Sequence, residues 1–459
     1  LRPHSLYLVA KCINDNPQAG IIYSDEDKID EFGTRFEPHF KTDWNRDLLY
    51  GHNYISHLGV YRHDVVKKCG GFRVGMEGSQ DYDLLLRCVA LVADQDIHHI
   101  PHILYHWRAL KTSTANTLNT KSYATDAGLK ALNEHLRETE QPGKAVLHVN
   151  GTYRVKWKIK GEPPLVSIII PTKDKVEVLR TCITSILEKT EYATYEILIV
   201  DNNSVEQKTH HYYQDLLAKH HNISVLEYSQ AFNFSAIVNY GVAAASGKVV
   251  VLMNNDTEVI NGNWLYELTS LALRDGIGAV GCKLYYPDGR IQHAGVFLYK
   301  DLPGNHIYLK REGDDSGYFN RLHLVQNYSA VTAACLAIRK EIYKEVGGCD
   351  EQNLKVAYND VDLCLRLVQA GYTNLWTPFA ELFHHESLSR GNDLDETNYK
   401  RFRQEMDYML DKWGAYSERD PYFNPNLSVH TFTDEYAFPP MVQYEWNDQP
   451  VKTLIETLA

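Results

Sequence analysis

The sequence predicts an α/β protein built on an open, doubly wound and mostly parallel sheet. Short apolar runs such as 165–170 and 249–253 have the length of strands that are buried on both faces. Segments with apolar residues at helical spacing separate these runs, as expected of β-α-β units. Polar residues follow the strands directly, at the edge of the sheet where such folds bind their ligands.

The composition is that of an ordinary globular protein. The chain has 459 residues, enough for two or three domains of about 150 residues each. With 47 Lys and Arg against 59 Asp and Glu, the formal net charge is −12, which argues against nucleic acid as the main partner. No apolar run approaches the ~20 residues of a membrane helix. The eight cysteines form no C-x-x-C pair, so we expect a reducing cytoplasm and no zinc ribbon.

Residues 116–163 are expected to connect the two main parts of the chain. The pattern of 122–136 predicts a helix. The segment 146–159 predicts two short strands around Asn150-Gly151, a dipeptide that favours a hairpin turn. The Gly and Pro residues of 161–164 then indicate a linker.

From residue 164 onward, predicted strands and helices alternate. The apolar run 165–170 predicts a buried strand that Pro171 ends. Helical spacing over 176–187 leads to a second buried strand at 196–200, which ends at Asp201. The remaining elements of this series are a strand at 225–228, a helix at 235–245 and a strand at 249–253. A later segment, 399–413, also has helical patterning.

A phrase of the form amide-D-x-D-L-x-L-R occurs twice in the chain. The copies are QDYDLLLR at 80–87 and NDVDLCLR at 359–366, and a Gly-Gly pair precedes each of them. His106 and His384 follow the two copies at similar distances. Because these parts recur in the same order, we expect two related domains.

The two copies differ in what precedes them. An acidic cluster at 24–27 lies ahead of the first copy and Asn254-Asn255-Asp256 lies ahead of the second, and we expect these clusters to be counterparts. The whole strand and helix series precedes Asp256, whereas only 24 residues precede Asp25. We therefore expect the first domain to lack its front half, and the chain to be part of a longer protein.

The polar residues at the strand ends are candidates for a nucleotide site. The Asp201 carboxylate can accept hydrogen bonds from a base or a ribose, and Asp256 can hold a divalent cation beside a diphosphate. Asn and Asp also end strands simply because they favour turns. The sequence has no G-x-G-x-x-G and no P-loop, so we expect bound phosphates to need a metal ion.

Six motifs follow one another within residues 164–391: PLVSIIIPTKD, EILIVDNNS, FNFSAIVNYG, VVVLMNNDTEV, YNDVDLCLRL and FHHESLSRG. In this order they resemble the family 2 glycosyltransferases of bacterial surface-polysaccharide synthesis, which have the GT-A fold. YSDEDK, YISHLGVYR, GSQDYDLLLRC and YHWR, within residues 21–115, resemble the acceptor-side half of a second such domain. The resemblance implies an inverting transfer from a UDP-, dTDP- or GDP-sugar that depends on Mg²⁺ or Mn²⁺.

The resemblance also implies a nucleotide and metal site at the strand ends. The nucleotide contacts that it implies are Thr172, Asp201 and Asn255. Asp256 matches the last residue of the family's D-x-D motif and would hold the metal ion. Here the motif reads N-N-D, which leaves one strong anionic ligand. His384 matches a histidine that completes the metal site in relatives, and its neighbour His385 remains an alternative.

A catalytic base is implied by the second copy of the repeated phrase. Asp360, in the pair Asn359-Asp360, matches the base of the family. In an inverting transfer the acceptor hydroxyl attacks from the side opposite the nucleotide, so a carboxylate on that side takes the proton. We expect Asp362 to position the following helix, because apolar residues surround it.

The first domain repeats some of these positions. Its expected counterparts of the metal, base and histidine residues are Asp25, Asp27, Asp81 and His106. It lacks the strands that would hold a nucleotide beside them. The expected organisation is an acceptor-side half-domain at 1–115, a helix, hairpin and linker at 116–163, a complete GT-A domain at 164–391, and a helix with a tail at 392–459.

Three functions are open at this point. The resemblance implies transfer to a polysaccharide or a lipid-linked glycan in O-antigen, capsule or rhamnan synthesis. The enzyme would then be cytoplasmic, with peripheral association at the membrane. The alternative is a non-catalytic glycan-binding or scaffolding protein on the same fold. A glycoside hydrolase with Asp256 and Asp360 as its acid/base pair is the third, and it would need neither a metal ion nor a nucleotide.

Overall fold

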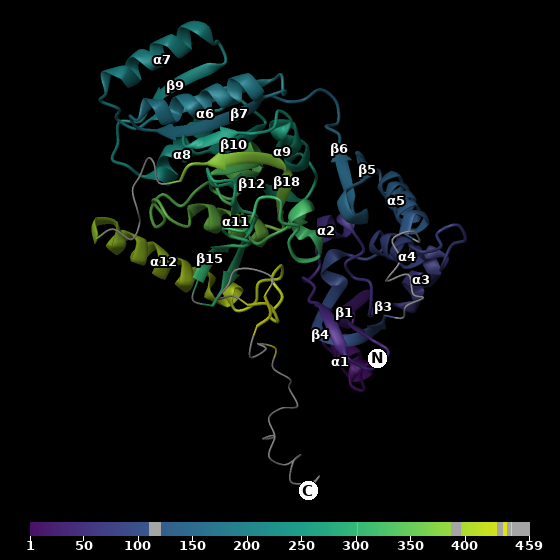
Figure 1. Cartoon of the computed structure of the whole chain (residues 1–459). Helices are drawn as coiled ribbons and strands as arrows, with labels where there is room; N and C mark the ends of the chain where they lie inside the picture. Colours follow the sequence, from purple (N-terminus) through teal and green to yellow (C-terminus); the bar gives the residue numbers. More distant parts are fainter. Residues whose placement is uncertain (110–120, 301, 387–395, 429–434, 438–441, 443–459) are drawn as a thin grey trace.

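The computed structural model describes residues 1–109, 121–300, 302–386, 396–428, 435–437 and 442. A larger unit contains a ten-stranded sheet, and a smaller unit that includes the N-terminus contains a four-stranded sheet (Figure 1). The expected domain boundaries at 115/116 and 391/392 lie outside the described residues. Within the described part of the chain, no helix has the length and apolarity that crossing a membrane requires.

The larger sheet has the strand order β11-β18-β12-β17-β10-β7-β8-β9. Four neighbouring strands run parallel: β7 (Val166–Thr172), β8 (Tyr195–Asp201), β9 (Ile223–Glu227) and β10 (Val249–Met253). A second parallel pair is formed by β12 (Ile277–Tyr285) and β18 (Thr373–His384). The antiparallel strand β17 (Cys335–Arg339) joins the two groups. This sheet confirms the predicted α/β fold class.

Shorter strands and helices complete the larger unit. The strands are β11 (Thr257–Val259), β13 (Ile291–His293), β16 (Gln326–Asn327) and the hairpin of β14 (Val296–Tyr299) and β15 (Leu302–His306). The helices are α6 (Val176–Lys189), α7 (Gln207–Lys219), α8 (Phe234–Ala244), α9 (Trp264–Ala272), α10 (Lys340–Glu345), α11 (Asn359–Gln369) and α12 (Glu396–Ser417). The helices predicted near 176–187, 235–245 and 399–413 are therefore confirmed.

Strand β7 shows why the sheet is buried on both faces. Ile168 and Ile170 belong to the same apolar core as α6 and α9, whereas Ile169 belongs to the core that contains α8 and α11. The prediction that Pro171 ends the strand was wrong, because Pro171 still pairs with Val200 of β8. Its missing N–H is tolerated there because the pairing of β7 with β10 has already ended at Ile169.

The smaller unit has its own sheet and helices. Its strands are β1 (Ile21–Ile29), β2 (Arg35–His39), β3 (Gly59–Tyr61) and β4 (Ile97–Arg108). Its helices are α1 (Ser5–Asp15), α2 (Arg46–Gly51), α3 (His63–Cys69) and α4 (Gln80–Val89). The connection contains α5 (Lys121–Glu138) and the antiparallel hairpin of β5 (Gly143–Leu147) and β6 (Tyr153–Trp157), which confirms the predicted helix and hairpin.

The two units share one topology over their repeated part. In the smaller unit, β1 pairs parallel with β4 and antiparallel with β3. In the larger unit, β12 pairs in the same way with β18 and β17. Arg87 of α4 donates to the carbonyl oxygens of Cys69 and Gly71, and Arg366 of α11 makes the equivalent pair of bonds. The repeat seen in the sequence thus extends to strand pairing and to hydrogen bonds.

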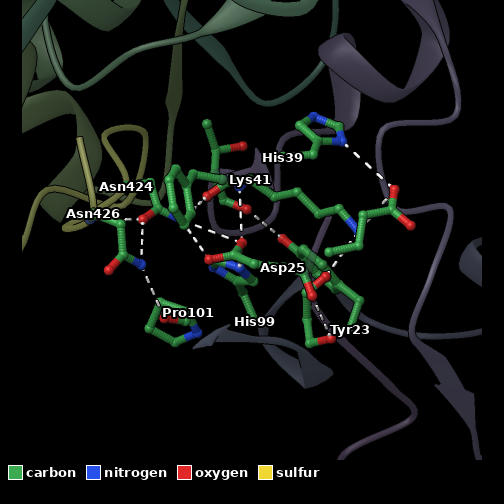
Figure 2. A network of polar contacts seen from close by, with 12 residues as sticks. Tyr23, Asp25, His39, Lys41, His99, Pro101, Asn424 and Asn426 are labelled. Atoms are coloured by element: carbon green, nitrogen blue, oxygen red, sulfur yellow. Dashed lines mark hydrogen bonds and ion pairs between the residues drawn. The ribbon is translucent and has the colours of Figure 1, made fainter. Parts of the chain in front are cut away.

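A segment after α12, residues 420–426, ties the two units together and is called the clasp below. Asp420 accepts a hydrogen bond from a backbone N–H of β14 in the larger unit (2.8 Å). Asn424 donates to the Asp25 carboxylate (3.1 Å) and to the Lys41 carbonyl oxygen (2.7 Å) of the smaller unit (Figure 2). The clasp therefore joins segments that lie almost 400 positions apart in the chain.

Lys41 is a buried cation beneath the clasp. Its Nζ donates to the carbonyl oxygens of Ser24 (2.8 Å) and Ile55 (2.6 Å) and lies 3.7 Å from the Glu26 carboxylate. Burial alone would raise the pKa of Glu26, but the Lys41 charge and two histidines hold that pKa well below its usual value. Glu26 therefore stabilises the fold above its ordinary pKa, and this contribution is lost as the pH falls.

We expect Lys41→Met to lower the free energy of unfolding by about 3–5 kcal/mol, because it leaves Glu26 buried without its cation. Urea denaturation followed by circular dichroism measures this change. The control is Lys28→Met, which removes a cation that pairs with the exposed Glu37. It should cost less than about 1 kcal/mol. Equal effects of the two substitutions would contradict the assignment.

Candidate active site

The predicted site residues of the larger unit lie at the carboxyl ends of its strands. Thr172 ends β7 and lies in register with Asp201 at the end of β8. Asn255, two residues after β10, donates from Nδ2 to the Thr172 hydroxyl (2.9 Å). The three residues expected at the nucleotide thus meet at one edge of the sheet, where open α/β sheets bind ligands.

The Asp201 carboxylate accepts hydrogen bonds from neighbouring residues of the chain. Its carboxylate accepts hydrogen bonds from the hydroxyl and the N–H of Ser204 and from the Tyr213 hydroxyl (2.9 Å). Burial, together with the Asp201 charge, raises the pKa of Tyr213, so this hydroxyl remains a donor. Only 6% of Asp201 is exposed, and its hydrogen bonds stabilise the turn that follows β8. Sequence reasoning did not identify Ser204 or Tyr213 as its partners.

Asp256 and His384 form a corner at the ends of β10 and β18. The Asp256 Oδ1 lies 3.1 Å from the His384 Nε2, and Asn254 Nδ2 lies 3.3 Å from the same nitrogen. Asp256 is 4% exposed and His384 is 9% exposed. His385 points elsewhere, with its Nε2 at 3.3 Å from Glu258. Of the two neighbouring histidines, the structure therefore brings His384 to Asp256.

The hydrogen bonds around Gln292 define which nitrogen of His384 carries the proton. Gln292 donates from Nε2 to Glu386 (3.3 Å), so its Oε1 faces the His384 Nδ1 at 2.8 Å. An amide oxygen only accepts, which assigns the proton of the neutral ring to Nδ1. The His384 Nε2 then carries a lone pair that faces the Asp256 carboxylate. A histidine held in this way is arranged as a metal ligand is.

This corner fits a divalent cation whose other ligands come from a bound molecule. Two atoms with lone pairs, the Asp256 Oδ1 and the His384 Nε2, face each other and attract a positive charge between them. Within the described ranges, no group of three or more His, Cys, Asp or Glu side chains is placed to hold a metal ion. The corner would then supply two ligands, and Mg²⁺ or Mn²⁺ would take further oxygens from phosphate or water.

Asp360 lies at the start of α11, across a short loop from this corner. Its Oδ2 accepts the N–H of Ala333 (3.0 Å), and its Oδ1 accepts the N–H of Val361 (2.9 Å). The next residue of the loop, Ala334, accepts the N–H of Asn254 (3.0 Å). The backbone of two consecutive alanines therefore bonds to both groups: the Ala333 N–H to the Asp360 carboxylate, and the Ala334 carbonyl oxygen to the end of β10.

Asp362, by contrast, is a structural residue, as predicted. It is fully buried and accepts hydrogen bonds from Arg366 (2.8 Å), Lys412 (2.7 Å) and Trp413 (2.9 Å). These contacts fasten α11 to α12. They leave Asp360 as the carboxylate of this motif that retains exposed surface.

An open pocket of about 470 Å³ includes Glu386, which follows His384 by two residues. Its lining residues are Tyr286, Pro287, Asp288, Arg290, Lys310 and Glu386. Glu386 links the pocket to Gln292, which in turn holds His384. Sequence reasoning did not single out Gln292, because the segment around it, PDGRIQH at 287–293, carries no recognisable motif.

The acidic cluster of the smaller unit is not the counterpart of Asn254–Asp256, contrary to the prediction. Asp25 pairs with Ile103 of β4, just as Lys283 of β12 pairs with Glu381 of β18. Asp25 and Asp27 therefore lie within a strand equivalent to β12, whereas Asp256 follows a different strand, β10. The position equivalent to β10 is beside β3, and there the described residues place no strand.

The contacts of this cluster are structural. Asp25 accepts hydrogen bonds from His99 (2.8 Å) and from the clasp residue Asn424 (Figure 2). Asp27 forms ion pairs with Arg35 and with His106. His106 thus faces Asp27, whereas its expected counterpart His384 faces Asp256. Within the described part of the smaller unit, Asp25 and Asp27 thus both have protein partners of their own.

Asp81 keeps the position of Asp360 in the repeat. It is the second residue of α4, as Asp360 is the second residue of α11, and both retain exposed surface. Asp81 accepts a hydrogen bond from the Asn53 side chain (3.0 Å). The smaller unit therefore retains the carboxylate of the repeated motif without the strands that stand opposite it in the larger unit.

Residues 167–347 match the sequence profile of glycosyl transferase family 2. This part of the chain belongs to that family. Together with the ten-stranded sheet, the match confirms the predicted GT-A fold class. Thr172, Asp201, Asn255, Asp256 and Gln292 lie within the family 2 profile, whereas Asp360 and His384 follow it on α11 and β18.

Longer relatives cover nearly the whole chain. The chain is 51% identical over 433 residues to the uncharacterized protein y4gI of Sinorhizobium fredii, covering 94% of this chain and 47% of that protein. It is 37% identical over 440 residues to the O-antigen biosynthesis protein RfbC of Myxococcus xanthus, covering 95% of this chain and 33% of that protein. The chain thus spans half or less of the length of these relatives.

Solved structures show more distant likenesses. GalNAc-T7 with UDP, GalNAc and Mn²⁺ is 15% identical, with a TM-score of 0.44 over 55% of this chain and 50% of that chain. The mannosyltransferase PcManGT from Pyrobaculum calidifontis in complex with GDP-Man and Mn²⁺ is 16% identical, with a TM-score of 0.41 over 57% of this chain and 68% of that chain.

Proposed function

We propose that the chain is an inverting, metal-dependent glycosyltransferase that moves a sugar from a nucleotide-sugar donor to a polysaccharide or lipid-linked glycan. The observation that carries this proposal is the placement of Asp360 and of the Asp256 corner on two sides of one short loop. The family 2 match of residues 167–347 supports the same reaction class. A hydrolase would use two carboxylates as acid and base and would have no use for the His384 arrangement.

Asp360 acts as the base in the proposed reaction. The acceptor hydroxyl attacks the anomeric carbon, the bond from that carbon to the leaving diphosphate breaks, and Asp360 takes the hydroxyl proton. The Ala333 N–H donates a hydrogen bond to the Asp360 Oδ2, and the Val361 N–H donates one to the Asp360 Oδ1. They hold the carboxylate at a fixed angle, and each oxygen keeps a further lone pair for the proton.

The Asp256 corner serves the leaving group. When Mg²⁺ or Mn²⁺ is bound there by Asp256 and His384, it neutralises the charge that develops on the diphosphate. Gln292 keeps the proton of His384 on Nδ1, so that Nε2 stays available as a ligand. The hydrogen bond between Asn255 and Thr172 fixes the neighbouring strand ends, against which we place the nucleoside.

The substrates proposed are those of bacterial cell-surface polysaccharide synthesis. The similarity to an O-antigen biosynthesis protein over 95% of this chain supports such an acceptor. A UDP-, dTDP- or GDP-sugar is the proposed donor class. A lipid-linked acceptor would bring the protein to the inner face of the membrane as a peripheral protein.

We propose that the smaller unit is the acceptor-side half of a second domain of the same kind. Two observations support this proposal. Strand β1 pairs with β4 and β3 as β12 pairs with β18 and β17, and Arg87 makes the same backbone hydrogen bonds as Arg366. Because no strand of the described residues lies beside β3, we place the donor in the larger unit. Transfer by these 459 residues is then the work of the larger unit alone.

Asp360→Asn should lower transfer by roughly 10²–10⁴-fold and leave nucleotide affinity nearly unchanged, because the amide keeps the shape of the carboxylate and loses its basicity. Transfer from a panel of UDP-, dTDP- and GDP-sugars in the presence of Mn²⁺ measures the effect. The matched control is Asp81→Asn at the equivalent position of the smaller unit, which should not change transfer. Near-normal transfer by Asp360→Asn would refute the base assignment.

Asp256→Asn should weaken Mn²⁺ binding and abolish the dependence of nucleotide affinity on the metal ion, since it removes the anionic ligand of the corner. Electron paramagnetic resonance of free Mn²⁺ during titration, with and without UDP, dTDP or GDP, reports both effects. His385→Gln is the control for the neighbouring histidine and should bind like the unmodified protein. Equal nucleotide affinity with Mn²⁺ and with a chelator would exclude the proposed metal site.

A further inference from the structure

His306 stands on the base side of the proposed site, at the end of β15. Gly304 of the same strand lies against α11, so that a Cβ built on it would meet the Val361 side chain at 3.0 Å. Asp360 directly precedes Val361. The Asp360 charge also acts on the His306 ring and favours its protonated form. His306 therefore lies on a strand that packs against the start of α11, within reach of the Asp360 charge.

The contacts of His306 determine where its proton lies. The His306 Nδ1 is 3.1 Å from the Gln292 carbonyl oxygen and 3.1 Å from the Nδ1 of His293. Because a carbonyl oxygen only accepts, the hydrogen lies on the His306 Nδ1. The His293 Nδ1 must then be bare and must share that hydrogen as a second acceptor. The Nδ1–H of His306 thus donates to two acceptors of β13, the Gln292 carbonyl oxygen and the His293 Nδ1.

The opposite nitrogen of His306 is available to a ligand. Burial lowers the pKa of His306 despite the Asp360 and Glu386 charges, and burial lowers the pKa of His293 well below its usual value. With the ring neutral and its proton on Nδ1, the Nε2 carries a lone pair. This Nε2 accepts no hydrogen bond from any residue that the structure describes, and His306 is half-buried whereas His293 is fully buried.

We propose that His306 is an acceptor-positioning residue whose bare Nε2 accepts a hydrogen bond from an acceptor hydroxyl next to the one that Asp360 deprotonates. This inference rests on the proposed function. The site then takes two neighbouring hydroxyls of one sugar ring, one at Asp360 and one at His306. An acceptor sugar with a free vicinal diol is the substrate class that satisfies both groups.

The competing explanation is that His306 matters only as a donor to β13. Two conservative substitutions separate these roles, because each replaces one of the two ring nitrogens by an amide group and loses the other. His306→Gln can place an amide oxygen near the position of Nε2, whereas His306→Asn can place an amide N–H near the position of Nδ1. Acceptor binding depends on the first position, and the bond to the Gln292 carbonyl depends on the second.

The experiment measures transfer from the active nucleotide sugar to methyl α-L-rhamnoside, methyl α-D-mannoside and methyl α-D-glucoside. His306→Asn should raise the acceptor KM by roughly tenfold to a hundredfold, as expected when a bound polar group loses its partner. His306→Gln should recover most of this loss. For both variants, the donor KM and Mn²⁺ affinity should stay within about twofold of the unmodified values. A mono-deoxy acceptor that lacks the second hydroxyl should abolish the difference between the variants.

The opposite order, with His306→Asn near normal and His306→Gln impaired, would show a purely structural role and overturn the proposal. Equal acceptor KM values in both variants and the unmodified protein would also overturn it. Donor hydrolysis that requires Mn²⁺, measured without any acceptor, reports separately on the proposed function. The two proposals therefore fail in different measurements.

Discussion

Two hydrogen bonds on consecutive alanines set the geometry on which the proposed chemistry depends. Ala333 donates to Asp360, and Ala334 accepts from Asn254 at the end of β10. A backbone loop has little freedom once both bonds are made, so the carboxylate and the strand end hold a fixed separation. Transfer of a glycosyl group needs such a fixed separation, because the base and the leaving group must stand on opposite sides of one carbon.

A second layer of contacts gives the site its chemical character. Gln292 uses both ends of its side chain and its backbone oxygen: the side chain holds His384, and the carbonyl oxygen holds His306. One residue of β13 thus decides which nitrogen of each histidine carries a proton. Groups of this kind orient a site without touching the substrate, and they set whether an imidazole is offered as a donor or as a lone pair.

Much of the fold could be predicted because its signals are local. Continuous apolar runs gave the parallel strands, helical spacing gave α6, α8 and α12, and Asn150-Gly151 marked the hairpin. Pro171 was misplaced because its tolerance depends on where β10 stops, which the sequence around Pro171 does not show. The corner of Asp256 and His384 was expected from a family resemblance, and its support by Gln292 could not be predicted because that contact spans 92 positions.

The acidic cluster of the smaller unit depends on contacts between distant parts of the chain. Asp25 and Asp27 follow an apolar pair, as the residues at a strand end do, and yet β1 continues past them to Ile29. Acidic residues are tolerated inside this strand because distant partners, such as His99 and the clasp residue Asn424, neutralise or satisfy them. A short sequence window contains none of these partners.

The most direct test of the central claim is the configuration of the anomeric carbon in the first product. The claim is that one carboxylate, Asp360, faces the acceptor across the sugar from the Asp256 corner, so that the reaction is a single displacement. NMR of the glycoside product, whose anomeric configuration is fixed once the bond has formed, reads this configuration from the anomeric coupling. We expect inversion relative to the donor, and retention would rule out a single displacement with Asp360 as the base.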